Sequence, residues 1–287
     1  MLKYQGDDVS SASSPVKYTE VLLNHNHRQW ECSAATDCGR RRPLNEDYYI
    51  CDSNKGIFLV ADGMGGENCG EVASQLTAEY FENAVLPFIT DEDATIPFDQ
   101  IYEENIFEKT LKHAAVETNL AVLEYAESHE SHKGMGSTLT AVVYYDNELW
   151  VTHIGDSRLY AIQDDIIQQV TTDHTKVQEM VQKKVISAQD ARKHPQKHII
   201  TKCVGRKSQF KPDIFNLDLS VKNLYLICSD GLYDMVEDDE ILSIVQHSDG
   251  FDKINQNLIR KANQYGGKDN ITVVLFRMHS ETTNNNE

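Results

Sequence analysis

The sequence predicts an α+β fold in which antiparallel β-sheets are covered by pairs of helices. Two observations lead to this prediction. Segments with strand character occur in adjacent pairs along the chain, and they do not alternate one for one with helices as they would in a doubly wound parallel sheet. Helical periodicity is confined to a few longer segments, and no long linker or internal repeat divides the chain.

Nine segments are short apolar or alternating runs that end at glycine or aspartate, as strands do. The residues from Tyr144 to Glu148 are typical of a hairpin turn between two of them. In chain order the predicted strands are 31–36, 47–52, 56–61, 137–145, 148–154, 158–163, 166–171, 222–228 and 270–278.

Three segments repeat apolar residues at helical spacing, and Gly266 and Gly267 end the last one. The acidic stretch 90–104 is predicted to be a solvated connection between two helices. It is not a calcium loop, because Ile96 stands where such a loop needs glycine. The predicted helical segments are 72–80, 107–122 and 251–265.

A single domain is expected to span residues 30–279. Residues 1–29 are polar and serine-rich without a sustained period, so we expect a flexible lead-in, in which 18–23 could add an edge strand. Residues 280–287 are expected to form a disordered tail.

Composition excludes several classes of protein. Hydrophobic residues make up 40% of the 287, enough for a sizeable core, and 45 acidic against 27 basic residues give a formal charge of −18, which argues against nucleic-acid binding. No apolar run approaches the length of a membrane span, and the N-terminus lacks a secretory signal pattern. Six cysteines without a C-x-x-C pair favour neither zinc nor a disulfide scaffold, so we expect reduced thiols and a cytoplasmic protein.

One recurring unit carries the functional signal: an apolar strand that ends in aspartate, with glycine beside it. A single Asp-Gly pair is usually a plain turn, but several of them suggest a shared role. The members are Asp62–Gly63 in FLVADG, Gly155–Asp156 in VTHIGD and Asp230–Gly231 in LYLICSDG, and two related sites precede strands, Asp269 in GGKDN and Glu46–Asp47 in RRPLNED.

If these carboxylates converge, they repel one another unless cations lie between them. Oxygen ligands of this kind suit Mg²⁺ or Mn²⁺ and not zinc. A glycine after a ligand aspartate also lets the backbone carbonyl approach a metal. Arg42, three residues before Asn45, could hold a phosphate with its two-pronged guanidinium. A surface arginine within the triplet 40–42 is the open alternative.

The motifs RPLNED, FLVADGMGG, GMGSTLTAVV, HIGDSRLYAI, TTDH, ITKCVG, CSDGLYDMV and GGKDNITVV occur in one order between residues 31 and 277. In this order and spacing the chain resembles the metal-dependent Ser/Thr protein phosphatases, the protein phosphatase 2C-like family, in its compact bacterial form. The resemblance implies two antiparallel sheets stacked between helix pairs. It also implies hydrolysis of phosphoserine and phosphothreonine in proteins, by direct attack of a hydroxide that bridges two metal ions and without a phosphoenzyme.

The same resemblance implies a role for each motif residue. Asp62 would bridge two Mn²⁺ or Mg²⁺ ions, and the Gly63 carbonyl would bind one of them. The other first-site ligands would be Asp230 and Asp269, with Glu46 acting through water. The remaining implied roles are a third, weaker metal for Asp156, shared with Asp230, phosphate binding for Arg42, and support for Asp47 and Asn270.

Some positions depart from the family pattern. Met64 stands where many eukaryotic relatives carry a histidine that could protonate the leaving group. We interpret His174 as a structural histidine at the base of a loop. Lys202 replaces a frequent arginine, which leaves its side-chain role open. The polar, basic segment 175–198, which we call the flap, lies where the family carries a mobile flap, and it is either a substrate-docking element or a plain helical connection.

Two other functions remain as alternatives. One is a catalytically silent relative that binds phosphoproteins or a kinase as an adaptor, and the other is a metal-binding regulatory module. Retention of Asp62, Asp230, Asp269 and Arg42 favours an active hydrolase, because silent relatives usually lose a metal carboxylate. The expected partners are phosphorylated proteins, the substrates of a Ser/Thr kinase, and a monomer is expected.

Overall fold

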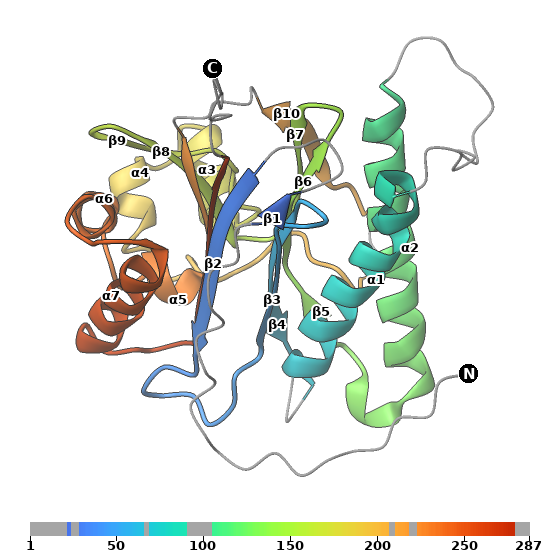
Figure 1. The fold of residues 1–287 in the computed structure, drawn as a ribbon. Helices are drawn as coiled ribbons and strands as arrows, with labels where there is room; N and C mark the ends of the chain where they lie inside the picture. The colour runs from blue at the N-terminus through green and yellow to red at the C-terminus, as the bar shows by residue number, and fades with distance from the viewer. Residues whose placement is uncertain are drawn as a thin grey trace, which may run out of the picture.

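Two antiparallel sheets stack face to face in the computed structural model, which describes residues 22–23, 29–65, 69–90, 105–206, 210–217 and 223–278 (Figure 1). The strand order is β1-β2-β12-β11-β8-β9 in one sheet and β10-β7-β6-β4-β3 in the other, where β5 also pairs with β4. The strands are β1 (Leu22–Leu23), β2 (Gln29–Asp37), β3 (Asp47–Asp52), β4 (Ile57–Met64), β5 (Gly136–Ser137), β6 (Leu139–Tyr145), β7 (Glu148–Ile154), β8 (Arg158–Gln163), β9 (Ile166–Gln169), β10 (Asp213–Leu217), β11 (Leu224–Cys228) and β12 (Ile271–Met278).

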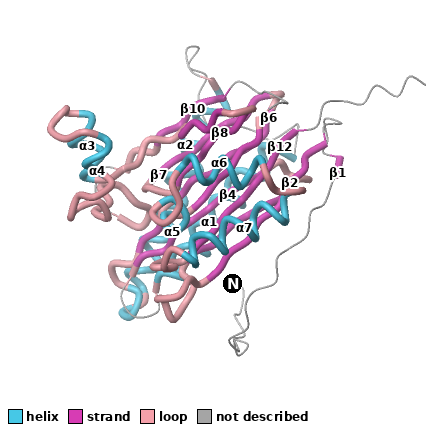
Figure 2. The backbone as a smooth tube through the Cα atoms, turned by 90° about the vertical axis from the view of Figure 1, so that its left-hand side faces the viewer, coloured by secondary structure: helices cyan, strands magenta, loops and turns pink. Residues whose placement is uncertain are grey.

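Helices cover both outer faces of the sandwich. The long pair α1 (Gly70–Thr90) and α2 (Ile106–Ser128) lies on the sheet of β4, and a short 3₁₀ turn (Glu130–His132) follows α2. The other sheet is covered by α5 (Asp230–Tyr233), α6 (Asp238–Gln246) and α7 (Phe251–Gln264). Two short helices of the flap, α3 (Lys176–Gln182) and α4 (Ala188–Ala191), project away from the sheets (Figure 2).

The two-residue period of the strands builds three apolar layers. On β4, Phe58 and Val60 face the partner sheet, whereas Leu59 and Ala61 face α1 and α2. The central layer includes Phe58 stacked on Phe276 with ring centroids 4.1 Å apart. Because both faces of the inner strands are buried, these strands read as continuous apolar runs in the sequence.

The predicted sandwich of antiparallel sheets between helix pairs is confirmed. Each of the nine predicted strands is present, although β9 ends at Gln169 and not at residue 171, and the predicted strand 137–145 is divided at Thr138 into β5 and β6. Strand β10 was not predicted, because its five residues are flanked by polar sequence and join the sheet only through pairing with β7. Helices α5 and α6 were also missed, since they are short.

The ends of the chain test the predictions only in part. Leu22–Leu23 pairs with β2 as the suggested edge strand, whereas the rest of the lead-in before Gln29, the connection 91–104 and the tail 280–287 lie outside the described residues. All six cysteines are free. Among the helices that the structure describes, none combines the length and the apolar character needed to cross a membrane.

The base of the flap is closed by backbone hydrogen bonds and two stacked histidines. His174 is buried, its Nδ1 accepts from the Gly155 amide at 3.1 Å, and its ring lies 4.8 Å from that of His153. Asp213 lies 3.1 Å from the other ring nitrogen of His174 and also binds Lys202. This arrangement agrees with a structural role for His174 and gives Lys202 a local partner.

Replacing His153 should reduce the loss in the free energy of unfolding that occurs when the pH falls below about 6.5. Burial and the neighbouring His174 lower the pKa of His153 to about 3, whereas the unfolded chain titrates near the ordinary value of about 6.5. As the pH falls below that value, the unfolded state takes up a proton that the folded state does not, so stability falls. Between pH 6.5 and pH 5 this amounts to about 2 kcal/mol.

The measurement is urea unfolding in EDTA across this pH range for wild type and His153→Gln. We expect the variant to lose about 2 kcal/mol less than wild type over the same interval. Parallel profiles would show that His153 takes up no proton on unfolding in this range.

Candidate active site

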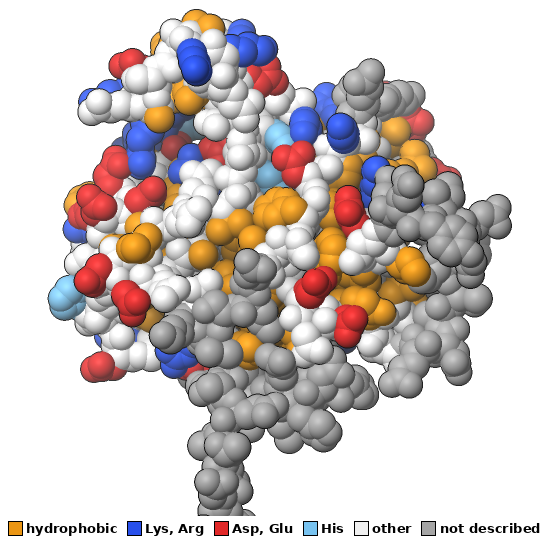
Figure 3. Space-filling model, turned by 90° about the horizontal axis from the view of Figure 1, so that it is seen from above, with side chains coloured by type: hydrophobic (Ala, Val, Ile, Leu, Met, Phe, Trp, Pro, Cys, Tyr) orange, Lys and Arg blue, Asp and Glu red, His pale blue; other side chains and the backbone are white. Residues whose placement is uncertain are grey.

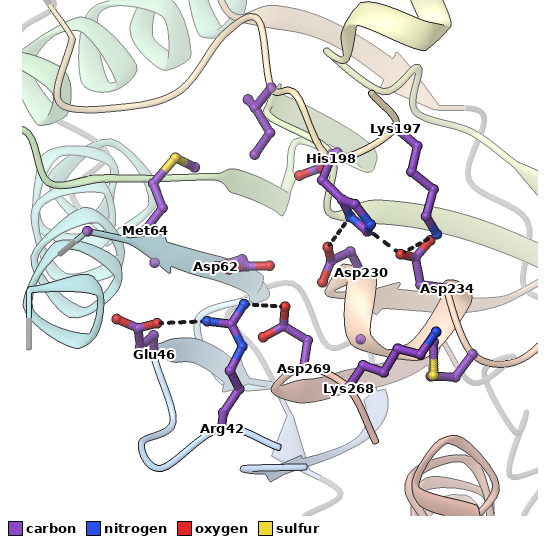
Figure 4. Close-up of a pocket in the computed structure, with 16 residues that line it drawn as sticks. Arg42, Glu46, Asp62, Met64, Lys197, His198, Asp230, Asp234, Lys268 and Asp269 are labelled. Carbon is purple, nitrogen blue, oxygen red and sulfur yellow. Dashed lines mark hydrogen bonds and ion pairs between the residues drawn. The ribbon is translucent and has the colours of Figure 1, made fainter. Parts of the chain in front are cut away.

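A cavity of about 430 Å³ gathers the predicted site residues at one end of the sandwich. Asp62 and Asp47 face each other across the β3–β4 pair, Asp230 follows β11, and Asp269 precedes β12. The separate strand ends thus deliver their carboxylates to one place (Figure 4). The predicted residues that line the cavity are Arg42, Glu46, Asp62, Gly63, Asp156, Asp230 and Asp269.

Arg42 lies at the edge of the cavity, between two carboxylates. Its guanidinium is 2.7 Å from Asp269 and 3.9 Å from Glu46, and its side chain remains 45% exposed. Figure 4 shows Arg42 reaching between Glu46 and Asp269. An exposed guanidinium with free donors can bind phosphate oxygens in pairs, so Arg42 is placed to meet a phosphoryl group that enters the cavity.

The carboxylates of the cavity destabilise one another's charged forms. Burial raises the pKa of Asp62 well above its ordinary value, and the charges of Asp47 and Asp230 raise it further. Asp230 is affected in the same way by burial and by Asp156 and Asp269. Burial raises the pKa of Glu46. The charge of Arg42 lowers this pKa and that of Glu71 raises it, but burial has the largest effect. The protein therefore concentrates negative charge that one arginine does not neutralise.

Asp47 and Asn270 lie beneath the cavity and do not line it. Asp47 Oδ2 accepts hydrogen bonds from the hydroxyls of Ser229 and Thr272, both at 2.7 Å, and burial raises the pKa of Asp47 to about 6. Asn270 accepts from the Glu46 amide at 2.8 Å and donates to the carbonyls of Cys38 and Leu44. Asn270 therefore holds the loop that carries Arg42 and Glu46.

Asp156 lines the cavity from the side of β7. Burial and the charge of Asp173 raise the pKa of Asp156 to about 7. The hydroxyl of Tyr233 donates to the Asp156 carbonyl at 3.0 Å, and Arg158 lies 3.6 Å from the centre of the Tyr233 ring. Tyr233, the last residue of α5, thus connects the loop of Asp156 to the helix that begins at Asp230.

Several residues of the cavity were not predicted. Lys197 and His198 come from the flap, Asp234 lies one helical turn after Asp230, and Lys268 immediately precedes Asp269. Lys197 binds Asp234 at 2.7 Å, and His198 lies 3.6 Å from the same carboxylate. The i,i+4 spacing within CSDGLYDMV could have indicated Asp234, because such residues share one helix face.

The residues fit divalent cations. Within the described residues, Asp47 Oδ1 is buried without a hydrogen-bond partner, which is a costly state for a carboxylate oxygen away from a cation. Gly63 is enclosed by backbone, since a Cβ there would lie 1.9 Å from the Gly70 carbonyl oxygen. Hard oxygen donors in excess of positive charge are the ligand set that Mg²⁺ and Mn²⁺ prefer.

Stacked antiparallel sheets with an acidic, arginine-edged cavity at one end define a metal-dependent protein phosphatase. The family model described as "Protein phosphatase 2C" matches residues 36–275. The chain belongs to this family.

Known relatives are similar over most of the chain. The serine/threonine phosphatase stp of Listeria innocua is 36% identical over 243 residues, which are 84% of this chain and 92% of the relative. The solved structure of the Mycobacterium tuberculosis serine/threonine phosphatase PstP/Ppp superposes with a TM-score of 0.76 at 33% identity, covering 88% of this chain and 99% of that one. A structure of the PstP catalytic domain in complex with two manganese ions gives a TM-score of 0.73 at 31% identity, over 88% and 99% of the two chains.

Proposed function

We propose that this protein hydrolyses phosphoserine and phosphothreonine in proteins by direct attack of water on phosphorus, without a phosphoenzyme. The observation that carries the proposal is the convergence of Asp62, Asp230 and Asp269 on one cavity beside Arg42. Among the described residues that line this cavity there is no serine, threonine, cysteine or tyrosine, so the usual hydroxyl and thiol nucleophiles are absent from it. The names of the relatives support the same activity.

Two divalent cations, Mn²⁺ or Mg²⁺, would be held by the carboxylates of the cavity and the Gly63 carbonyl. The carboxylates that would hold these two cations are Asp62, Asp230, Asp269 and, through water, Glu46. Asp156 and Asp230 would hold a third cation more weakly. When bound, the cations lower the pKa of water and offset negative charge on the phosphoryl group. The structure of a similar phosphatase in complex with two manganese ions supports the binding of two cations.

The chain's own side chains would bind and orient the substrate. Arg42 would bind phosphoryl oxygens. Asn270 would keep the loop of Arg42 and Glu46 in place through three hydrogen bonds between its side chain and backbone atoms of that loop. Asp47 would fix the start of β3 against Ser229. Met64 lines the cavity but has no proton to give, so the leaving alkoxide would take its proton from water or from another group of the cavity.

The partners and setting follow from the same proposal. The substrates would be proteins phosphorylated by a Ser/Thr kinase, and the catalytic domain would span residues 30–279 as a monomer. Six free thiols support a reducing compartment, the cytoplasm.

Phosphate release from matched phosphoserine, phosphothreonine and phosphotyrosine peptides tests the function. We expect Mn²⁺ to support turnover of the first two peptides and EDTA to abolish it. Mn²⁺ binding without phosphate release from any peptide would favour the regulatory-module alternative, and phosphopeptide binding without turnover would favour the adaptor. Neither alternative explains why the full carboxylate set and Arg42 remain together.

A further inference from the structure

The flap, residues 175–198, carries a charge opposite to that of the chain as a whole. Two carboxylates stand there against six basic side chains, in a protein of formal charge −18. The projecting lobe at the top of Figure 3 shows blue side chains facing solvent. The six basic residues are Lys176, Lys183, Lys184, Arg192, Lys193 and Lys197.

Part of this positive charge fastens the flap to the body of the protein. Arg192 donates to the Tyr233 carbonyl at 3.1 Å and pairs with Glu237 at 2.9 Å. Lys197 pairs with Asp234 at 2.7 Å. These contacts account for two of the six cations and fix the inner side of the flap against α5 and the residues that follow it.

Three other lysines are left for solvent or a ligand. Lys176, Lys184 and Lys193 are exposed, and within the part of the chain that the structure describes they form no ion pair. Lys183 has only the exposed Glu179 at 3.4 Å, a pair of little strength. The outer side of the flap is therefore basic overall, with four exposed lysines against the two exposed carboxylates of Glu179 and Asp190.

Lys184 occupies a backbone position that favours glycine. Helix α3 ends with the amides of Lys184 and Val185 bonded to the carbonyls of Val181 and Met180, and Lys184 has φ +57°. Glycine is the usual residue at such a helix end, and a lysine there is strained. The next side chain, Val185, is 64% exposed. The end of α3 thus presents a charged and an apolar side chain together on the exposed side of the flap.

The inner side of the flap borders the active site, so its outer surface belongs to a segment that adjoins the catalytic cavity. Lys197 and His198 line the catalytic cavity and also a second cavity of about 240 Å³. Ala188 and Arg192 of the flap line that second cavity as well. An extended peptide advances about 3.3 Å per residue, so residues a few positions from a bound phosphoresidue would reach the flap.

We infer that the outer surface of the flap binds acidic or additionally phosphorylated residues that flank the target phosphoserine or phosphothreonine. The favoured substrates are then acidic segments of phosphoproteins. The inference rests on the proposed function. An acidic substrate is otherwise repelled by this acidic chain, and a basic flap next to the cavity offsets that repulsion and steers the segment to it.

Two phosphothreonine peptides test the inference, one with glutamate flanks and one with glutamine at the same positions. The variant is the triple replacement Lys176→Gln, Lys184→Gln and Lys193→Gln. We expect wild type to prefer the acidic peptide by about tenfold in kcat/KM at low salt, mainly through KM, and the triple variant to lose that preference. Hydrolysis of a small aryl phosphate should not change, and about 0.5 M salt should abolish the preference in wild type.

The matched control is Lys112→Gln, Lys253→Gln and Arg260→Gln, which removes the same charge from exposed positions on α2 and α7. This control should keep the preference for the acidic peptide. If wild type hydrolyses both peptides equally, or if the control loses the preference as the flap variant does, the inference is wrong while the proposed function stands. If wild type hydrolyses neither peptide with Mn²⁺ present, the proposed function fails and the inference fails with it.

A single substitution separates binding from local structure. Lys184→Gly relieves the strained backbone, so it should raise the thermal stability of the protein or leave it unchanged. The same variant should lower kcat/KM for the acidic peptide by about twofold to fivefold and leave the neutral peptide unaffected. Unchanged kinetics on both peptides would remove Lys184 from the docking surface.

Discussion

Asp62→Asn should lower Mn²⁺-dependent phosphopeptide hydrolysis by about a thousand-fold, equivalent to about 4 kcal/mol of transition-state stabilisation. Asp62 stands in the middle of the carboxylate cluster, at the end of the buried strand β4. Asparagine keeps the shape of the side chain but not the charge with which Asp62 would hold the two proposed cations. In EDTA the same variant should be more stable than wild type, because burial and neighbouring carboxylates disfavour the charged form of Asp62.

The two readouts are kcat/KM with Mn²⁺ and the melting temperature in EDTA. Asp249→Asn is the matched control, because Asp249 is exposed and outside the cavity, and it should change neither quantity. Near wild-type turnover of Asp62→Asn would remove Asp62 from the reaction. An inactive variant with a lower melting temperature in EDTA would mean that the loss arises from damage to the fold.

The candidate site residues can be singled out in the sequence, whereas their convergence cannot. Each aspartate stands at one end of a strand-like run, after it for Asp62 and Asp230 and before it for Asp269, and this can be read locally. Their meeting depends on pairings between distant segments, such as β2 with β12, in which Asp37 lies opposite Ile271. The order of strands in the two sheets fixes these pairings, and no local pattern encodes that order.

The contribution of the flap to the cavity was missed for a related reason. The sequence predicted a basic segment near the site but could not orient it. Lys197 and His198 reach the cavity because the bridge between Thr175 and Ile200 closes the base of the flap. Asn270, by contrast, was predicted to support the site, and the structure shows it bonded to the loop that carries Glu46.

The glycines of the Asp-Gly pairs have a reason that the sequence did not reveal. From the sequence, glycine at these positions is expected to let its backbone carbonyl approach a metal ion. In the structure, Gly63 and Gly231 are each pressed against the backbone of another segment, and a Cβ at either position would lie 1.9 Å from a carbonyl oxygen. Close approach of distant backbones brings the aspartates before these glycines into one cavity.

Gly231→Ala should therefore destabilise the protein by about 3 kcal/mol or more and lower its activity as well. The added methyl group would meet the carbonyl oxygen of Asn270, which is backbone and cannot rotate away. Either α5 or the start of β12 must therefore move. Helix α5 carries Asp230, and β12 begins two residues after Asp269. In a domain of this size, we expect a melting temperature lower by about 6 to 12 °C.

The matched control is Gly134→Ala, because Gly134 has φ +81° but no atom within 4 Å of the added Cβ. This control should lose only about 1 kcal/mol of stability, because alanine is strained at a positive φ, and it should keep its turnover. Thermal unfolding and kcat/KM with Mn²⁺ measure both variants. If Gly231→Ala is no less stable than Gly134→Ala, the close contact between α5 and Asn270 is not what holds Asp230 and Asp269 together, and the cavity must be shaped by the sheets alone.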